Sequence, residues 1–154
     1  MNKKYFFLII FLLIGVFFVS HFSKNSIPSV NIENIKYVKI GGQDVKVDLA
    51  LTETQQATGL SGRQGLATNE GMLFVFNKPD KYSFWMKDMN FPIDIIWITE
   101  DMKIIYIKKD ALPSLYPETY GPTTSDANAK YVLETIAGFS DKNNLKIGDN
   151  ISFL

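Results

Sequence analysis

The sequence contains no cysteine and a single histidine, His21. Without cysteine, the chain cannot form a disulfide, a cysteine zinc site, an iron–sulfur cluster or a thiol nucleophile. A single histidine also excludes multi-histidine metal sites, and the histidine-dependent serine triad is not expected. Any acid–base chemistry would fall to carboxylates, lysine or tyrosine. We therefore expect no metal and no cofactor, and the sequence favours a protein that is not an enzyme.

Excess charge is also missing, because 16 Lys and Arg residues balance 16 Asp and Glu residues. A protein that binds nucleic acid by neutralising phosphates needs a basic surplus, so we expect no nucleic-acid partner. The chain has 154 residues, 46% of them apolar. This length and composition predict one folded domain and exclude an intrinsically disordered chain.

An apolar run near the start predicts a membrane segment. The 18 residues from Tyr5 to Phe22 follow the basic residues Lys3 and Lys4. As a helix at ~1.5 Å per residue they span about 27 Å, close to the ~30 Å hydrocarbon core of a bilayer. The flanking lysines place the N-terminus in the cytoplasm and the rest of the chain outside, in the periplasm or at the cell surface.

The alternative is a secretory signal that is removed by cleavage. Signal cleavage requires small residues at positions −3 and −1. Cleavage after Ser20 or after Ser23 would place Phe18 or His21 at −3. Neither residue is small, so we favour an uncleaved anchor; a cleaved chain would be secreted to the periplasm. We predict an anchor or signal in residues 1–23, a linker in 24–34 and a β-rich domain in 35–154.

Alternating apolar and polar residues predict strands in this domain. Residues 35–40 and 45–51 form a predicted hairpin around Gly41 and Gly42. Further strands are expected over residues 72–76, 82–86, 93–98, 103–108, 131–136 and 150–153. The segment 93–98 is apolar on both faces, which predicts an interior strand paired with 103–108.

Helices are expected to be few. Thr52 and Gln55 form a capping-box pattern that predicts a short helix over 53–60, and Asn77–Asp80 is a predicted turn. Residues 112–129 form a long proline-rich irregular segment, typical of a functional or disordered loop. The fold class is therefore mainly β: a single compact β-sandwich or barrel of about eight short strands with one or two short helices, preceded by an N-terminal membrane helix.

An ordered series of short motifs runs through this domain. It comprises Gly59–Leu60 within residues 54–63, Gly71–Phe76, Phe84–Lys87, Pro92–Ile96, Val132–Glu134, Ala137–Gly138 and Ile147–Asp149. From about Val45 to Phe153 the series resembles a bacterial and archaeal family called domain of unknown function 192. The resemblance implies a small β-rich, jelly-roll-like fold, frequently behind a signal or anchor, and implies no established activity.

The chain departs from this family pattern at three points. Ser61 stands where the family commonly has methionine, and Asp88 stands where it commonly has asparagine. No cysteine follows the segment Ala111–Pro113, where the family frequently has one. Any chemistry that depends on that cysteine is missing from this chain.

Two carboxylates, Asp94 and Glu134, are embedded in apolar strands and require compensation. Lys87 and Arg63 are the candidate counter-ions, so we expect Arg63 and Asp94 in one polar cluster with Lys87 or Glu134 as a third member. Three interpretations remain open. The cluster is an ion-pair network that fixes strand register, a polar pocket for a small ligand, or a pair of glycosidase carboxylates.

The aromatic residues divide into two groups. A core position is expected for those on strands: Phe74, Phe76, Phe84, Trp85 and Trp97. Tyr116 and Tyr120 lie in the irregular segment instead. They either stack on a sugar or a partner or pin this segment to the domain.

These features predict a membrane-anchored, extracytoplasmic β-rich module of the cell envelope that binds a ligand or a partner. It contacts the membrane through residues 5–22. The candidate ligand-binding residues are Arg63, Lys87, Asp94, Glu134, Tyr116 and Tyr120. The alternative is a carboxylate-dependent hydrolase that acts on envelope or carbohydrate substrates.

Overall fold

The computed structural model describes residues 31–123 and 128–154. The predicted membrane segment, residues 5–22, lies outside the described residues. Among the described residues, no helix combines the length and the apolar character needed to cross a bilayer. Residues 31–154 form one compact unit, and this unit is mainly β, as expected.

Nine strands and four short helices make up the described unit. They follow one another as η1 (Ile32–Asn34), β1 (Tyr37–Ile40), β2 (Gln43–Ala50), α2 (Glu53–Thr58), β3 (Glu70–Asp80), β4 (Phe84–Trp85), β5 (Ile93–Ile98), β6 (Ile104–Ala111), η2 (Pro113–Leu115), β7 (Thr119–Tyr120), β8 (Ala129–Ile136), α3 (Phe139–Lys142) and β9 (Ser152–Phe153). The predicted linker therefore contains η1, whose Ile32 packs against the domain core. The irregular segment 112–129 contains η2 and β7, which the sequence did not predict.

Seven strands form one sheet in the order β6-β5-β8-β3-β2-β1-β9, and β4 and β7 form a separate two-stranded sheet. All pairs are antiparallel except β2 with β3. At one end the two edges of the main sheet approach each other. The Ile104 N–H donates to the Asp149 carbonyl at 2.9 Å, and the Ile151 N–H donates to the Met102 carbonyl at 2.9 Å.

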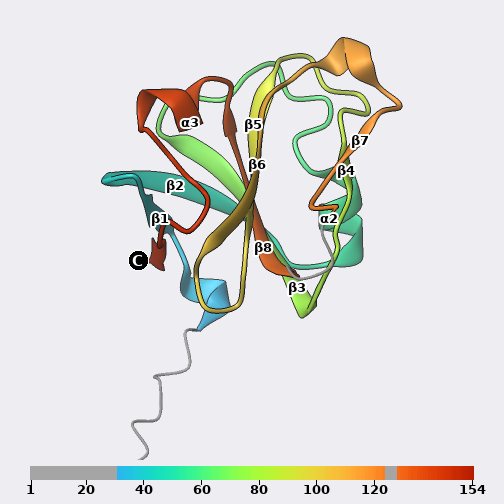
Figure 1. The fold of residues 1–154 in the computed structure, drawn as a ribbon. Helices are drawn as coiled ribbons and strands as arrows, with labels where there is room; N and C mark the ends of the chain where they lie inside the picture. Colours follow the sequence, from blue (N-terminus) through green and yellow to red (C-terminus); the bar gives the residue numbers. More distant parts are fainter. Residues whose placement is uncertain (1–30, 124–127) are drawn as a thin grey trace, which may run out of the picture. The chain divides into compact units, whose positions relative to one another are not determined.

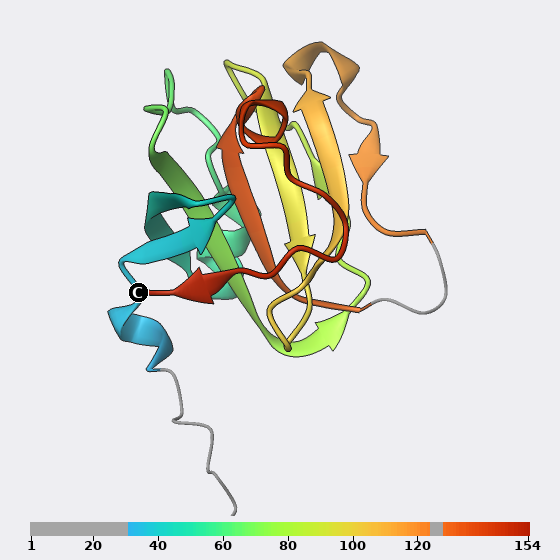
Figure 2. The ribbon, with the colours of Figure 1, turned by 60° about the vertical axis from the view of Figure 1, so that its left-hand side comes forward.

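The main sheet is thus a strongly curled partial barrel (Figures 1 and 2). The predicted architecture, a two-sheet sandwich or a closed barrel, is only partly right. A single sheet curls far enough to enclose a core, and its edges are joined by a few hydrogen bonds at one end. Figure 1 shows α2, β4 and β7 on one side of this sheet and α3 on the other.

Local sequence signals explain several of these elements. The Thr52 hydroxyl accepts from the Gln55 N–H at 3.2 Å, and the Gln55 side chain accepts from the Thr52 N–H at 3.0 Å. This capping box begins α2, as predicted. The β1–β2 hairpin is also confirmed. The predicted turn at Asn77–Asp80 is wrong, because β3 continues through it and pairs Asp80 with Ala129 after a register shift.

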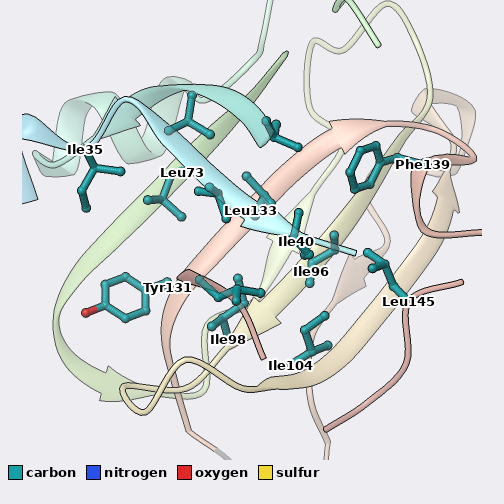
Figure 3. Close-up of a cluster of buried hydrophobic side chains, with 14 of the residues drawn as sticks. Ile35, Ile40, Leu73, Ile96, Ile98, Ile104, Tyr131, Leu133, Phe139 and Leu145 are labelled. Atoms are coloured by element: carbon teal, nitrogen blue, oxygen red, sulfur yellow. The ribbon is translucent and has the colours of Figure 1, made fainter. Parts of the chain in front are cut away.

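Two buried clusters lie on the two faces of the main sheet. The inner core, on the concave face, includes Val38, Ile40, Leu73, Ile96, Ile98, Ile104, Leu133, Phe139 and Leu145; Figure 3 shows its side chains converging from several strands and from α3. The outer core includes Ala50, Leu60, Met72, Phe74, Met86, Ile93, Ile95, Trp97, Tyr120 and Val132.

Strand β5 contributes to both cores, and all six of its residues are buried. Ile96 and Ile98 enter the inner core, whereas Ile95 and Trp97 enter the outer core. The predicted interior strand and its pairing with β6 are confirmed. The prediction that Trp85 is a core residue is wrong, since its side chain is 51% exposed.

Candidate functional site

Asp94 is completely buried in β5, and three backbone N–H groups surround its carboxylate. Oδ1 accepts from Asp110 at 2.9 Å and from Gly138 at 3.2 Å. Oδ2 accepts from Ser140 at 2.8 Å. Hydrogen bonds to a carboxylate are stronger than those between neutral groups, so these three compensate the free-energy cost of burying the group. Asp94 therefore ties the start of α3 and the end of β6 to β5, and Arg63 is not among its hydrogen-bond partners.

Asp94 and Glu134 lie on opposite faces of the main sheet. In the antiparallel pairing of β5 with β8, Asp94 lies opposite Thr135 and Ile95 lies opposite Glu134. Directly paired residues share a face, and successive residues alternate. Asp94 thus lies on the face of Ile96, in the inner core, and Glu134 on the face of Ile95, in the outer core. The two carboxyl groups do not flank one cleft, which a paired-carboxylate hydrolase requires.

Glu134 sits in a row of residues that crosses the sheet from β2 to β5. The register aligns Asp48 with Met72, Met72 with Glu134, and Glu134 with Ile95. The two immediate neighbours of Glu134 are therefore apolar. The residue is 4% exposed, and its Oε2 atom has no hydrogen-bond partner among the described residues. Burial raises the pKa of the Glu134 carboxyl to about 8, and the Arg63 charge opposes part of this rise.

A pocket of about 120 Å³ opens over Glu134. Its walls come from the last turn of α2 and the residues after it, from β3 and from the segment around β4. The lining residues are Gln56, Ala57, Thr58, Gly59, Leu60, Ser61, Phe74, Phe76, Tyr82, Ser83, Phe84, Trp85, Met89 and Glu134. Five of them are aromatic, and Glu134 is the only carboxyl group among them. Uncharged polar side chains complete the lining, and a cleft that combines aromatic walls with a buried titratable group is a typical small-molecule site.

Gly59 brings the chain close to the Glu134 carboxyl. Its φ is +51°, a left-handed conformation that glycine adopts without strain. A Cβ atom at this position would lie 3.3 Å from the Phe74 ring and 4.0 Å from Glu134 Oε2. The glycine after α2 therefore leaves room beside the carboxyl. The sequence placed Gly59 inside the predicted helix 53–60 and in a family motif, whereas α2 ends at Thr58 and Gly59 caps it.

Arg63 and Lys87 do not join Asp94, so the predicted four-residue cluster does not form. The Arg63 guanidinium pairs with Asp48 at 2.9 Å, and both side chains are substantially exposed. Asp48 lies in the same row as Glu134, two strands away, at roughly 10 Å for a strand spacing of about 4.8 Å. Arg63 thus acts on Glu134 through its field. Lys87 is exposed, and only its backbone carbonyl is engaged, by the Ser61 hydroxyl at 2.8 Å.

The two predicted tyrosines have different environments. Tyr120 is buried, its hydroxyl bonds Glu118 at 3.2 Å, and Lys108 Nζ lies 4.4 Å from its ring centroid. These contacts pin the irregular segment to the domain. Tyr116 is 45% exposed, and its ring lies edge-on to Trp85 with centroids 6.3 Å apart. Tyr116 therefore lies next to one wall of the pocket without lining it.

Among the pockets of the described residues, the one over Glu134 is the one that a buried carboxyl group lines. A wider hollow of about 500 Å³ between the β1–β2 turn and α3 is lined mainly by exposed or half-buried residues. Within residues 31–123 and 128–154, no group of three or more acidic or histidine side chains could hold a metal ion. The pocket over Glu134 is therefore the candidate functional site.

Comparisons with known proteins agree with this fold. The model of the DUF192 family, described as "Uncharacterized ACR", matches residues 36–153. The sequence matches none of the curated proteins with which it was compared.

Two solved structures are similar in fold and sequence. A protein of unknown function from Novosphingobium aromaticivorans DSM 12444 is 30% identical, with a TM-score of 0.68, over 75% of this chain and 81% of that one. A candidate transcription regulator from Sinorhizobium meliloti 1021 is 31% identical, with a TM-score of 0.67, over 72% of this chain and 83% of that one.

Proposed function

Since this chain belongs to the DUF192 family, which its description leaves uncharacterised, we propose from the geometry of its own residues that the domain is a small-molecule-binding module. The binding site is the pocket over Glu134. One observation carries this proposal: Glu134 is buried at the pocket, and its Oε2 atom has no hydrogen-bond partner in the part of the chain that the structure describes. An unpaired buried polar atom costs about 1–3 kcal/mol, and a ligand that bonds it recovers that free energy.

The aromatic lining supports binding rather than hydrolysis. Aromatic walls beside a few polar groups can orient a ligand. Hydrolysis by paired carboxylates would require a second carboxyl at the same cleft, and the lining contains one. The label of candidate transcription regulator belongs to the Sinorhizobium protein. The present chain, with a net charge of zero, lacks the basic surplus that phosphate neutralisation requires.

A fragment screen by thermal unfolding of the full chain tests the proposal. Fragments that bind the native state raise the unfolding midpoint. We expect hits whose effect is lost in Trp85→Ala, which removes a pocket wall, and retained in the matched variant Tyr116→Ala. Trp85 and Tyr116 are both exposed and neighbouring, but only Trp85 lines the pocket. A screen without hits, or hits that are indifferent to Trp85→Ala, would contradict the proposal.

We further propose that the module is anchored in the membrane by residues 5–22 and works outside the cytoplasm, as an accessory protein of the cell envelope. The apolar length and the basic start of this segment support the placement. Alkaline phosphatase fused to the C-terminus should be active, and mass spectrometry should find an intact N-terminus in the membrane fraction. An inactive fusion would overturn the topology, and a new N-terminus between Ser20 and Asn25 would overturn the anchor.

A further inference from the structure

The only full charge that the side chains lining the pocket over Glu134 can carry near neutral pH is negative. Glu134 is the only carboxyl in its lining, and neither lysine nor arginine lines it. An anionic ligand would find no counter-charge there, and it would repel the carboxylate form of Glu134. Arg63, the nearest cation that acts on Glu134, is already paired with Asp48. The electrostatics of the pocket therefore favour a cation over an anion.

The remaining walls suit a cation as well. Phe74, Phe84 and Trp85 present aromatic rings, whose faces attract alkylammonium groups. The last turn of α2 also lines the pocket and contains no basic residue. The carbonyl end of a helix carries partial negative charge, although here the Gln55 and Thr58 carbonyls already accept from the Gly59 and Ser61 N–H groups. Three independent features, a buried carboxyl, aromatic rings and a helix C-terminus, thus surround one small cavity.

We propose that the pocket over Glu134 binds an alkylammonium group, with the Glu134 carboxylate as its counter-ion and the aromatic rings as its walls. This inference rests on the proposed function, because it names the chemical class that the same pocket takes. The Glu134 carboxylate, whose Oε2 has no hydrogen-bond partner among the described residues, accepts a hydrogen bond from the ammonium. A quaternary ammonium would be held by charge and ring contacts alone, so a protonated amine that can donate fits the unpaired oxygen better.

Ammonium binding must be linked to the loss of a proton. In the empty pocket the Glu134 pKa is about 8, so about nine in ten carboxyls are protonated at pH 7. A cation beside the carboxyl favours its ionised form, so binding at pH 7 releases nearly one proton. One other titratable side chain lines the pocket. Tyr82, on the segment before β4, stays neutral because burial raises its pKa above its ordinary value.

The test is calorimetric titration of the full chain, in neutral detergent, with tert-butylammonium chloride at pH 6, 7, 8 and 9. Two buffers of different ionisation enthalpy reveal the proton released. We expect the association constant to rise about tenfold per pH unit below pH 8 and to level off above it. Glu134→Gln, which keeps the shape of the side chain, should lose both the proton release and the pH dependence. Glu33→Gln, at an exposed site in η1, should retain both.

Two neutral probes that carry the same tert-butyl group decide the ligand class. We expect tert-butanol and pivalamide to bind at least tenfold more weakly than tert-butylammonium at pH 8. If either neutral probe binds as tightly and the binding is lost in Trp85→Ala, the ammonium inference is wrong and the small-molecule pocket stands. If no probe binds and the fragment screen is also empty, the proposed function itself is wrong. Ammonium binding that persists unchanged in Glu134→Gln would also overturn the inference.

Discussion

Glu134 on β8 is paired directly with Ile95 on β5, and this places its carboxyl on the face of the sheet opposite to Asp94. Asp94 is satisfied by three backbone N–H groups from the ends of two other elements. Glu134 lines a pocket, and no described residue forms a hydrogen bond with its Oε2 atom. Two buried carboxyls on adjacent strands therefore have different surroundings: Asp94 is hydrogen-bonded to the backbone of two other elements, and Glu134 lines a pocket.

Asp94→Asn should destabilise the domain by about 3–5 kcal/mol. The asparagine keeps one acceptor oxygen and turns an NH₂ group toward backbone donors that the carboxylate now satisfies. Urea denaturation of the full chain measures the loss. The folded variant should still bind pocket ligands with parental affinity, because Glu134 lies on the other face. A change below about 1 kcal/mol would show that the three hydrogen bonds contribute little.

Glu134→Gln should become more stable than the parent as pH rises. The folded carboxyl has a pKa of about 8 against 4.5 for the ordinary group, so between these values the native state holds a proton that the unfolded state has lost. Rising pH then favours unfolding by at most about 1.4 kcal/mol per pH unit, and the loss is complete above pH 8. A glutamine at position 134 does not titrate, so it adds no pH dependence to the free energy of unfolding.

The stability difference between Glu134→Gln and the parent should therefore grow by about 3–4 kcal/mol from pH 5 to pH 8. Urea denaturation at each pH gives this difference, and Glu33→Gln serves as the exposed control without a comparable trend. A flat difference for Glu134→Gln would mean that the carboxyl is already ionised in the native state at pH 5.

Arg63→Gln should raise the pKa of Glu134 above about 8. The Arg63 charge is what opposes the effect of burial on this carboxyl, and the substitution removes it. Carbon-detected NMR of the Glu134 side-chain carboxyl across the pH range gives the pKa directly. The change should cost the fold about 1 kcal/mol or less, because the Arg63–Asp48 pair is exposed.

Lys87→Gln is the matched control for that titration. Lys87 is also a cation, and it lies two residues after Trp85, which lines the pocket. Its side chain is exposed and does not contribute to the pKa of Glu134. The pKa of Glu134 should stay at its parental value in this variant. Equal shifts in both variants would indicate a general effect of net charge instead of a specific effect of Arg63.

Hydrogen exchange should be slowest in β5. All six residues of Ile93–Ile98 are buried, and the strand is bonded on both sides, by β6 and by β8. Opening these amides requires loss of both cores, so they should report the global free energy of unfolding. The amides of β9, a two-residue edge strand, should exchange faster. The reverse order would place the stable centre of the domain elsewhere.

Local features of this protein follow from the sequence alone. The capping box at Thr52 and Gln55, the β1–β2 hairpin and the burial of β5 each depend on residues close together in the chain. The family resemblance is also confirmed by the match over residues 36–153. The pattern of Asp94 among isoleucines correctly indicated a buried carboxylate that needs compensation.

Only the tertiary structure decided which groups meet. The alternation of apolar and polar residues shows which residues of one strand share a face of the sheet. It does not show how neighbouring strands are aligned with one another. A shift of the β5–β8 register by one residue would pair Asp94 with Glu134 and place both carboxyls on one face. The observed register separates them, and it leaves Asp94 to backbone N–H groups from Asp110, Gly138 and Ser140. Those donors belong to the ends of β6 and α3, which meet β5 only once the sheet has formed.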